Sequence, residues 1–247
     1  CMARDSGILY GLGVGPGDPE LITLKAARIL NTADVVYAAA STKNSYSLAV
    51  SIARPHIPDL TPVKMLRFPM TQDLAKKEKA WEKNARILIE ELTQSRIVAF
   101  ITLGDAMTYS TYGYVLRYVK KIAPQVPVIS VLGITSYQAC AASLNTPLVE
   151  GEEALLIVSG VKGGECVRKF ATVPENLVFM KAYRNVNDIA ATLDEAGLLE
   201  GSVAIKNCGL PDQEIISDIR TLKKTPPNYW TLVLARQKKI DAPSQEE

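Results

Sequence analysis

The sequence predicts an α/β protein made of two α/β domains, and three observations support this. Short apolar runs that suit buried strands alternate with helical patterns along almost the whole chain, which favours mostly parallel strands. Glycine-marked loops follow several of these strands. A short link bracketed by Pro124 and Pro127 interrupts the alternation, which then restarts. We therefore expect an N-terminal α/β domain over residues 1–123 and a C-terminal one over residues 124–247.

In the first half, four apolar runs predict strands, at residues 8–14, 34–40, 62–66 and 96–105. Each run is followed by a stretch with helical periodicity. The longest of these places four apolar residues near one face: Ala80, Ala85, Leu88 and Leu92. Asp18 and Pro19 suit the N-cap and first position of the first helix. The expected helices are 20–30, 45–54, 73–92 and 111–122.

In the second half the same alternation continues. Strands are expected at residues 127–133, 154–160, 176–184, 202–209 and 229–236. Helices are expected at 136–144, 165–173 and 186–197, the last with Gly197 as its C-terminal cap. Residues 214–222 are ambiguous, and the final residues are expected to fray.

Composition excludes several classes of protein. The 247 residues are 47% hydrophobic and carry a net charge of only +2, which is a globular balance with no electrostatic sign of a nucleic-acid partner. No apolar run approaches the length of a membrane span. None of the four cysteines forms a C-x-x-C pair, so we expect no metal site and a cytoplasmic protein with free thiols. His56 stands alone between prolines, which argues against a Ser-His-Asp or HExxH enzyme.

The run GILYGLGVGPGDP at the first strand invites comparison with a dinucleotide-binding loop. That fingerprint, G-x-G-x-x-G, fails here because its third glycine falls on Pro16 or Asp18. Proline offers no backbone N–H to a phosphate, and aspartate repels one. Asp34 precedes its strand, whereas a ribose-binding acid follows the second strand. We therefore expect a fold other than the classical Rossmann type.

Two further loops resemble the first in position. Gly104 and Asp105 follow one predicted strand, and Gly133 with Thr135 follows another. Helix capping explains Asp105 and Thr135 equally well when each is taken alone. Three glycine-marked loops at the carboxyl ends of strands, however, favour one shared ligand site. A carboxylate there suits a sulfonium or a ribose better than a phosphate.

Together these motifs resemble the S-adenosylmethionine-dependent tetrapyrrole (corrin and porphyrin) methyltransferases. The family's G-x-G-P-G-D motif is similar to residues 13–18, its G-D loop to Gly104-Asp105 with Tyr109, and its third loop to residues 132–136. A strand with Met180 and a turn over residues 207–212 also match in order. Ala106 and Leu132 stand where proline is common, so the second loop is expected to be looser. The resemblance covers roughly residues 7–235.

This resemblance implies a tetrapyrrole methylase fold, with two α/β domains whose mixed sheets form a cleft. It implies a C-methyltransferase with S-adenosyl-L-methionine as methyl donor, S-adenosyl-L-homocysteine as product and a tetrapyrrole as substrate. Details of the Gly-Asp loop and chain length are most similar to precorrin-2 or cobalt-factor II C(20)-methyltransferases of cobalamin biosynthesis. A cytoplasmic homodimer without nucleic acid, membrane or protein-bound metal is expected.

The resemblance also implies site residues. Expected cofactor contacts, several through the backbone, are Pro16, Leu103, Gly104, Asp105, Thr108, Thr135, Ser136, Met180 and Cys208. The carboxylates of a tetrapyrrole suit cations. Candidate substrate contacts are Tyr109, Tyr112, Arg184 and Lys43, with Lys181 and Arg67 as further cations. Each of these can also be a core residue or a solvated charge, and no catalytic base is identified.

Two alternatives stay open. The chain is compatible with another tetrapyrrole methyltransferase, of the uroporphyrinogen III or precorrin-4 type. From a different class, a non-catalytic nucleotide- or ligand-binding α/β protein has the same strand and helix pattern.

Overall fold

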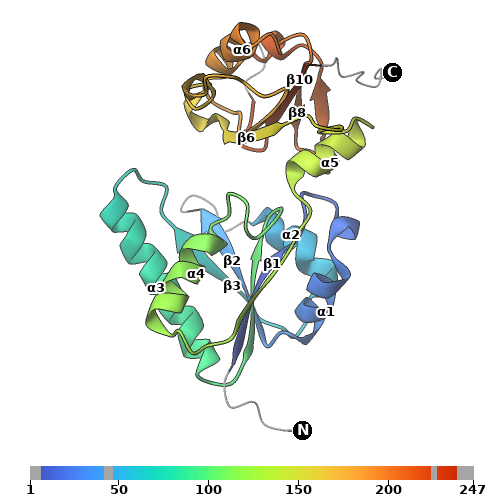
Figure 1. The fold of residues 1–247 in the computed structure, drawn as a ribbon. Helices are drawn as coiled ribbons and strands as arrows, with labels where there is room; N and C mark the ends of the chain where they lie inside the picture. The colour runs from blue at the N-terminus through green and yellow to red at the C-terminus, as the bar shows by residue number, and fades with distance from the viewer. Residues whose placement is uncertain (1–6, 42–46, 224–226, 238–247) are drawn as a thin grey trace. The chain divides into compact units, whose positions relative to one another are not determined.

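A computed structural model describes residues 7–41, 47–223 and 227–237 (Figure 1). The chain divides into two compact units, residues 1–135 and residues 136–247. The first unit extends beyond the expected boundary at residue 123, because the strand β5 (Val128–Val131) pairs with β1 (Ile8–Gly13) in the first sheet. The short link between Pro124 and Pro127 is therefore followed by an edge strand of the first sheet, and no new domain begins there.

The first unit is built on a five-stranded sheet in which every pair of neighbours is parallel. The strand order is β3-β2-β4-β1-β5, so β4 and β1 lie in the interior. The remaining strands are β2 (Val35–Ser41), β3 (Val63–Phe68) and β4 (Ile97–Thr102). Since all five are parallel, the loops that follow them leave from one edge of the sheet.

Helices cover both faces of this sheet, as the alternation of strand and helix predicts (Figure 1). On one face α3 (Leu74–Leu92) and α4 (Tyr112–Ile122) pack against Val98 and Phe100 of β4. On the other, α1 (Leu24–Thr32) and α2 (Leu48–Ala53) pack against Ala99 and Ile101. Successive residues of β4 thus point to opposite layers, and both are buried.

The first helix begins later than predicted. Asp18 accepts a hydrogen bond from the backbone N–H of Glu20 and caps only a short 3₁₀ turn, Pro19–Leu21. Thr23 then caps α1 by accepting from the backbone N–H of Ala26. Two capping residues in succession split the predicted helix into two pieces.

An ion cluster around the buried Glu91 carboxylate lies at the opposite edge of the first sheet, where the strands begin. The Glu91 carboxylate, at the end of α3, accepts hydrogen bonds from Tyr37 Oη and Lys64 Nζ, each at 2.7 Å, and from Arg96. Burial alone would raise the pKa of Glu91. The hydrogen bonds from Lys64, Tyr37 and Arg96 outweigh burial and lower that pKa from 4.5 to about 2.

The second unit has a five-stranded mixed sheet of order β6-β7-β10-β8-β9. Only β6 (Leu155–Ser159) and β7 (Asn176–Met180) pair in parallel; β10 (Leu232–Arg236), β8 (Ser202–Lys206) and β9 (Glu214–Ile216) join by antiparallel pairs. The expectation of mostly parallel strands is therefore wrong for this unit. The mixed sheet expected from the family resemblance is present in this unit, whereas the sheet of the first unit is parallel throughout.

Two layers also cover the second sheet. One face packs against α6 (Val186–Glu195) and the 3₁₀ turn Ile219–Lys223, and the other face against α5 (Ser136–Ser143). Gly197 follows α6 with φ +70, as a C-terminal glycine should. The ambiguous stretch 214–222 divides into β9 and the beginning of that 3₁₀ turn.

The helix expected at residues 165–173 is absent, and only the 3₁₀ turn Val167–Lys169 forms there. Tertiary contacts with α6 hold this segment. Arg168 bonds to both Asp188 and Glu195, and a Cβ on Gly164 would lie 1.7 Å from Thr192 Oγ1. Close packing on α6 overrides the weak local helical pattern.

Candidate cofactor-binding site

Three glycine-marked loops meet at the carboxyl edge of the first sheet. They follow β1, β4 and β5, and two of them are joined by a pair of backbone hydrogen bonds. Gly15 N donates to Gly104 O at 3.2 Å, and Gly104 N donates to Gly15 O at 2.8 Å. Both glycines have positive φ, at +84 and +69. The convergence of the loops within this unit, predicted from the sequence, is confirmed.

The third loop approaches so closely that no side chain fits. A Cβ on Gly133 would lie 2.1 Å from Gly104 O, and one on Gly13 would lie 2.6 Å from the same oxygen. Backbone atoms cannot yield as a flexible side chain can. Sequence reasoning used Gly13 only as a motif position and missed this contact, because glycine spacing along one loop carries no information about a distant loop.

Asp105 fastens the second and third loops together. Its Oδ1 accepts from the backbone N–H of Gly133 at 3.0 Å. Its Oδ2 accepts from the backbone N–H of Met107 at 2.8 Å and from Thr108 Oγ1 at 3.2 Å. The residue is only 7% exposed. The carboxylate of Asp105 therefore joins the second and third loops by hydrogen bonds and also places a carboxylate at this edge. The same hydrogen bonds hold the second loop, which was expected to be looser because Ala106 replaces a proline.

Exposed and buried side chains surround this edge. Met107, Tyr109 and Leu132 are exposed apolar residues, and Tyr109 has a left-handed backbone, φ +50. Pro16 and Thr135 are buried. The site thus offers backbone polar groups, a buried carboxylate and an apolar rim.

Tyr112, predicted as a candidate substrate contact or a core residue, lies in the core of the first unit. It is fully buried in the core under α4, and its Oη pairs with Ser130 Oγ at 2.9 Å. Its ring occupies the space beside Gly11, where a Cβ would lie 2.0 Å from Tyr112 Cζ. Burial raises the pKa of Tyr112. Core packing, the alternative given for this residue, is correct.

In the second unit, Ser136 and Met180 meet. Ser136, the first residue of α5, donates from Oγ to Met180 Sδ at 3.7 Å. One turn further along α5, Cys140 shares a buried apolar cluster with Cys208 and Met180. Burial raises the pKa of the Cys140 thiol. Three of the predicted cofactor contacts, Ser136, Met180 and Cys208, are therefore neighbours within this unit, with the Cys208 side chain in the core.

The predicted substrate cations differ in their surroundings. Arg184 is exposed and lies over the ring of Tyr183, and Lys181 Nζ lies over the ring of Tyr229. Arg67 is exposed on the edge strand β3. Lys43 lies outside the described residues. Sequence reasoning missed both tyrosines. Tyr229 had a signal in the aromatic Tyr229-Trp230 pair after two prolines, and Tyr183 had none.

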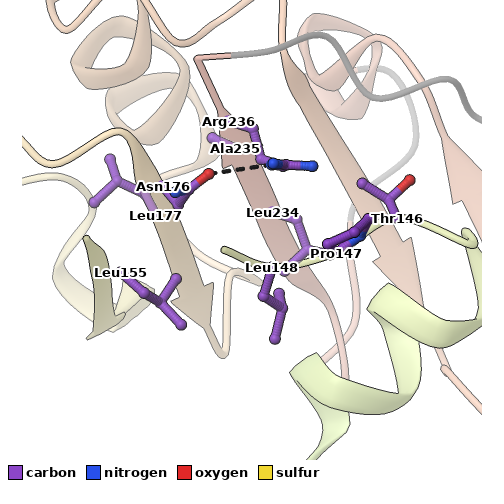
Figure 2. A pocket seen from close by; sticks show the side chains of 9 residues that line it. All are labelled: Thr146, Pro147, Leu148, Leu155, Asn176, Leu177, Leu234, Ala235 and Arg236. Atoms are coloured by element: carbon purple, nitrogen blue, oxygen red, sulfur yellow. Dashed lines mark hydrogen bonds between the residues drawn. The ribbon is translucent and has the colours of Figure 1, made fainter. Parts of the chain in front are cut away.

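A narrow apolar crevice elsewhere in the second unit is not this site (Figure 2). It is lined by Thr146, Pro147, Leu148, Leu155, Asn176, Leu177, Leu234, Ala235 and Arg236. Buried Arg236 donates to Asn176 Oδ1 at 3.1 Å and to Glu150 at 2.8 Å, so its charge is neutralised internally. None of the predicted site residues lines the crevice, and we regard it as structural.

Within the part of the chain that the structure describes, no cluster of His, Cys, Asp and Glu could hold a metal ion. No helix there is long and apolar enough to cross a membrane. The donor set at the loop edge is backbone, hydroxyl and carboxylate, which suits an organic ligand.

The fold is that of an α/β protein with two compact units, and its candidate ligand site lies at the carboxyl edge of a parallel sheet. The model of the tetrapyrrole (corrin/porphyrin) methylases matches residues 8–223, and the chain belongs to this family. The family resemblance stated from the motifs is thereby confirmed, as are the methyltransferase class and its methyl donor, S-adenosylmethionine.

Among curated relatives, cobalt-precorrin-2 C(20)-methyltransferase of Salmonella typhimurium is 36% identical over 94% of this chain and 97% of its own. Precorrin-2 C(20)-methyltransferase of Sinorhizobium is 29% identical over 92% and 94%. Among solved structures, uroporphyrin-III C-methyltransferase of Thermus thermophilus, complexed with S-adenosylhomocysteine, is 25% identical with a TM-score of 0.69, over 94% and 92% of the chains. A cobalt precorrin-4 methyltransferase, 18% identical with a TM-score of 0.69 over 93% and 94%, shares the fold.

Proposed function

We propose that this enzyme transfers a methyl group from S-adenosylmethionine to C(20) of precorrin-2 or its cobalt form, in cobalamin biosynthesis. The observation that carries the proposal is the 36% identity with a cobalt-precorrin-2 C(20)-methyltransferase along almost the whole of both chains. A second relative of the same name, from Methanocaldococcus jannaschii, is 36% identical over 73% of this chain. The joined loops support it, because they form the motif region on which the resemblance rests.

The chemistry of the loop edge fits the methyl donor. A sulfonium is a cation, and the buried Asp105 carboxylate places a negative charge at the edge. An adenine suits backbone donors and acceptors with an apolar rim such as Met107 and Leu132. No phosphate has to be accommodated. The residues that would hold the donor are Pro16, Leu103, Gly104, Asp105, Thr108, Thr135, Ser136, Met180 and Cys208.

The donor supplies an electrophilic methyl group, so the task of the protein is positioning. Transfer of the methyl group needs the nucleophilic carbon opposite the leaving sulfur, and holding both in line lowers the barrier. Rigid loops suit this task, since Gly15, Gly104 and Asp105 are fixed by hydrogen bonds. His56 contacts Pro19 O at 3.4 Å in a different loop, and we assign it no role as a base.

Methylation assays test the proposal directly. The protein is incubated with labelled S-adenosylmethionine and, separately, precorrin-2, its cobalt form, uroporphyrinogen III and precorrin-4. We expect label in a precorrin-2 form, with mass spectrometry giving one added methyl and NMR placing it at C(20). Label only in uroporphyrinogen III or precorrin-4 would contradict the proposal and favour the alternative methyltransferases.

Calorimetry tests binding of the donor's product to this chain separately from catalysis. We expect S-adenosylhomocysteine to bind and NAD not to bind. Binding of NAD without S-adenosylhomocysteine would refute the donor assignment.

We further propose that the protein acts as a cytoplasmic homodimer. The described cysteines, Cys140, Cys166 and Cys208, are free thiols, which suits a reducing compartment. The dimer is an expectation from the family resemblance. Sedimentation equilibrium tests it, and a monomer mass at micromolar concentration would contradict it.

A further inference from the structure

Two cations and two aromatic rings gather at the end of β7 in the second unit. The rings of Tyr183 and Tyr229 lie 5.3 Å apart between centroids, tilted by 58°. Lys181 Nζ is 5.6 Å from the centroid of Tyr229, and Arg184 Cζ is 5.1 Å from that of Tyr183. We call these four residues the Tyr183–Tyr229 cluster. Each cation lies within the range of a cation–π interaction.

The cluster is open to solvent. Tyr229 is 44% exposed, and Arg184 is exposed. Within residues 7–41, 47–223 and 227–237, Arg184 forms no ion pair, whereas Arg168 and Arg220 each bond to two carboxylates. A guanidinium over a ring keeps its N–H donors, which point outward in its own plane, for another acceptor.

The backbone beneath the cluster is held in an unusual conformation. Lys181 is left-handed with φ +58, which costs free energy because its Cβ comes close to the following carbonyl oxygen. The segment is pinned to the start of β10 because Ala182 N donates to Thr231 O at 2.8 Å. Asn228 Nδ2 donates to Asn207 Oδ1 at 2.7 Å and fixes the turn that carries Tyr229. Strain that surrounding contacts maintain in this way is concentrated at ligand sites.

We propose that the Tyr183–Tyr229 cluster binds the carboxylated rim of the tetrapyrrole substrate. Arg184 and Lys181 pair with its carboxylates, and the tyrosine rings pack against the macrocycle. The combination fits that chemistry, because a tetrapyrrole is a flat π system edged with carboxylates. Its place also fits, since the cluster begins one residue after Met180, a proposed contact of the methyl donor. The inference rests on the proposed function and names substrate contacts for it.

The test uses the full-length protein and a water-soluble porphyrin octacarboxylate, whose binding is followed by fluorescence in the presence of S-adenosylhomocysteine. We expect Arg184→Gln to weaken binding by about 10- to 100-fold, the effect of a lost charge-assisted pair. Tyr229→Leu should weaken it by about 10-fold, and Tyr229→Phe, which keeps the ring, by less than about 3-fold. Arg220→Gln, an exposed cation on the same unit, is the matched control and should leave binding unchanged.

Two further measurements separate this role from others. S-adenosylhomocysteine affinity, measured by calorimetry, should be the same in Arg184→Gln and wild type. In the methylation assay Arg184→Gln should raise KM for the tetrapyrrole with little change in kcat, because a binding contact away from the reacting carbon is lost.

Several results would overturn the inference. They are unchanged porphyrin affinity in both Arg184→Gln and Tyr229→Leu, an equal loss in Arg220→Gln, a parallel loss of S-adenosylhomocysteine affinity, or no binding of the porphyrin by wild type. Failure of the proposed function has a different signature. Methylation of another tetrapyrrole or another carbon would refute the C(20) assignment while the porphyrin titrations still distinguish the variants.

Discussion

Replacing Asp105 with asparagine removes one hydrogen-bond acceptor from the point where two loops are joined. The aspartate uses both oxygens, Oδ1 for Gly133 N–H and Oδ2 for Met107 N–H and Thr108 Oγ1. Asparagine keeps one oxygen and puts an NH₂ group in the place of the other. In either orientation an amide donor then faces a backbone N–H.

The expected cost follows from burial. Asp105 is 7% exposed, so the unpaired N–H cannot turn to bulk water. A buried donor left without a partner costs about 1–3 kcal/mol. We expect Asp105→Asn to lower the free energy of unfolding by about 2 kcal/mol, equivalent to a fall in Tm of about 4–8 °C for a chain of this size. Because the loops carry the proposed donor contacts, S-adenosylhomocysteine affinity should fall as well.

Thermal unfolding followed by circular dichroism measures the first effect, and calorimetry the second. The control is Asp73→Asn, the same isosteric change at the exposed N-cap of α3, where Asp73 accepts from Lys76 N at 3.1 Å. Asparagine is an equally good N-cap, so this variant should match wild type within about 0.5 kcal/mol. If Asp105→Asn is as stable as Asp73→Asn, the carboxylate does not hold the loops together, and any loss of affinity would mean direct contact with the ligand.

Other predictions concern different parts of the first unit. Gly133→Ala should lower the free energy of unfolding by about 3 kcal/mol or more, because the new methyl group overlaps backbone atoms of the neighbouring loops. It should also abolish S-adenosylhomocysteine binding in calorimetry. Gly113→Ala, in open space on α4, should instead raise the free energy of unfolding by about 0.5–1 kcal/mol. The pKa of Glu91 is lower in the folded protein than in the unfolded chain. Its contribution to the free energy of unfolding, measured by urea titration, should therefore be complete above pH 4.5 and be lost as the pH falls toward 2. Because Lys64 and Arg96 are half-exposed, this contribution is limited to about 2 kcal/mol. Glu91→Gln should remove the loss of stability between pH 4.5 and 2. If the variant loses stability in acid as wild type does, the Glu91 cluster is not the cause. Tyr112→Phe should cost about 1 kcal/mol in urea and leave porphyrin affinity unchanged, and weaker porphyrin binding at equal stability would restore this tyrosine to the substrate site.

Local pattern was sufficient for most of the first unit. The strand run RIVAFITLGD gives β4, and the periodicity of α3 gives its buried face, because both depend on neighbours along the chain. The link at residues 124–127 misled, since the pairing of β5 with β1 depends on a partner more than a hundred residues away. The 3₁₀ turn at Val167 and the antiparallel pairing of β10 depend on tertiary contacts in the same way.

At the candidate site, too, the sequence predicts some features and not others. Loop positions follow from strand ends, so the meeting of Gly15, Gly104 and Gly133 could be expected. Side-chain roles could not, because Tyr112 fills a space created by Gly11 and Asp105 bonds to a separate loop. Sharing of one ligand by the two domains stays a prediction, as do the individual donor contacts.

The Glu91 cluster and the glycine loops occupy opposite edges of one parallel sheet. Changes at sites this far apart add almost independently. The contribution of the Glu91 cluster to stability in acid can therefore be changed through Lys64 or Arg96 while the hydrogen bonds between the loops are left intact. Such separation lets the acid tolerance of the first unit vary independently of the geometry of its glycine loops.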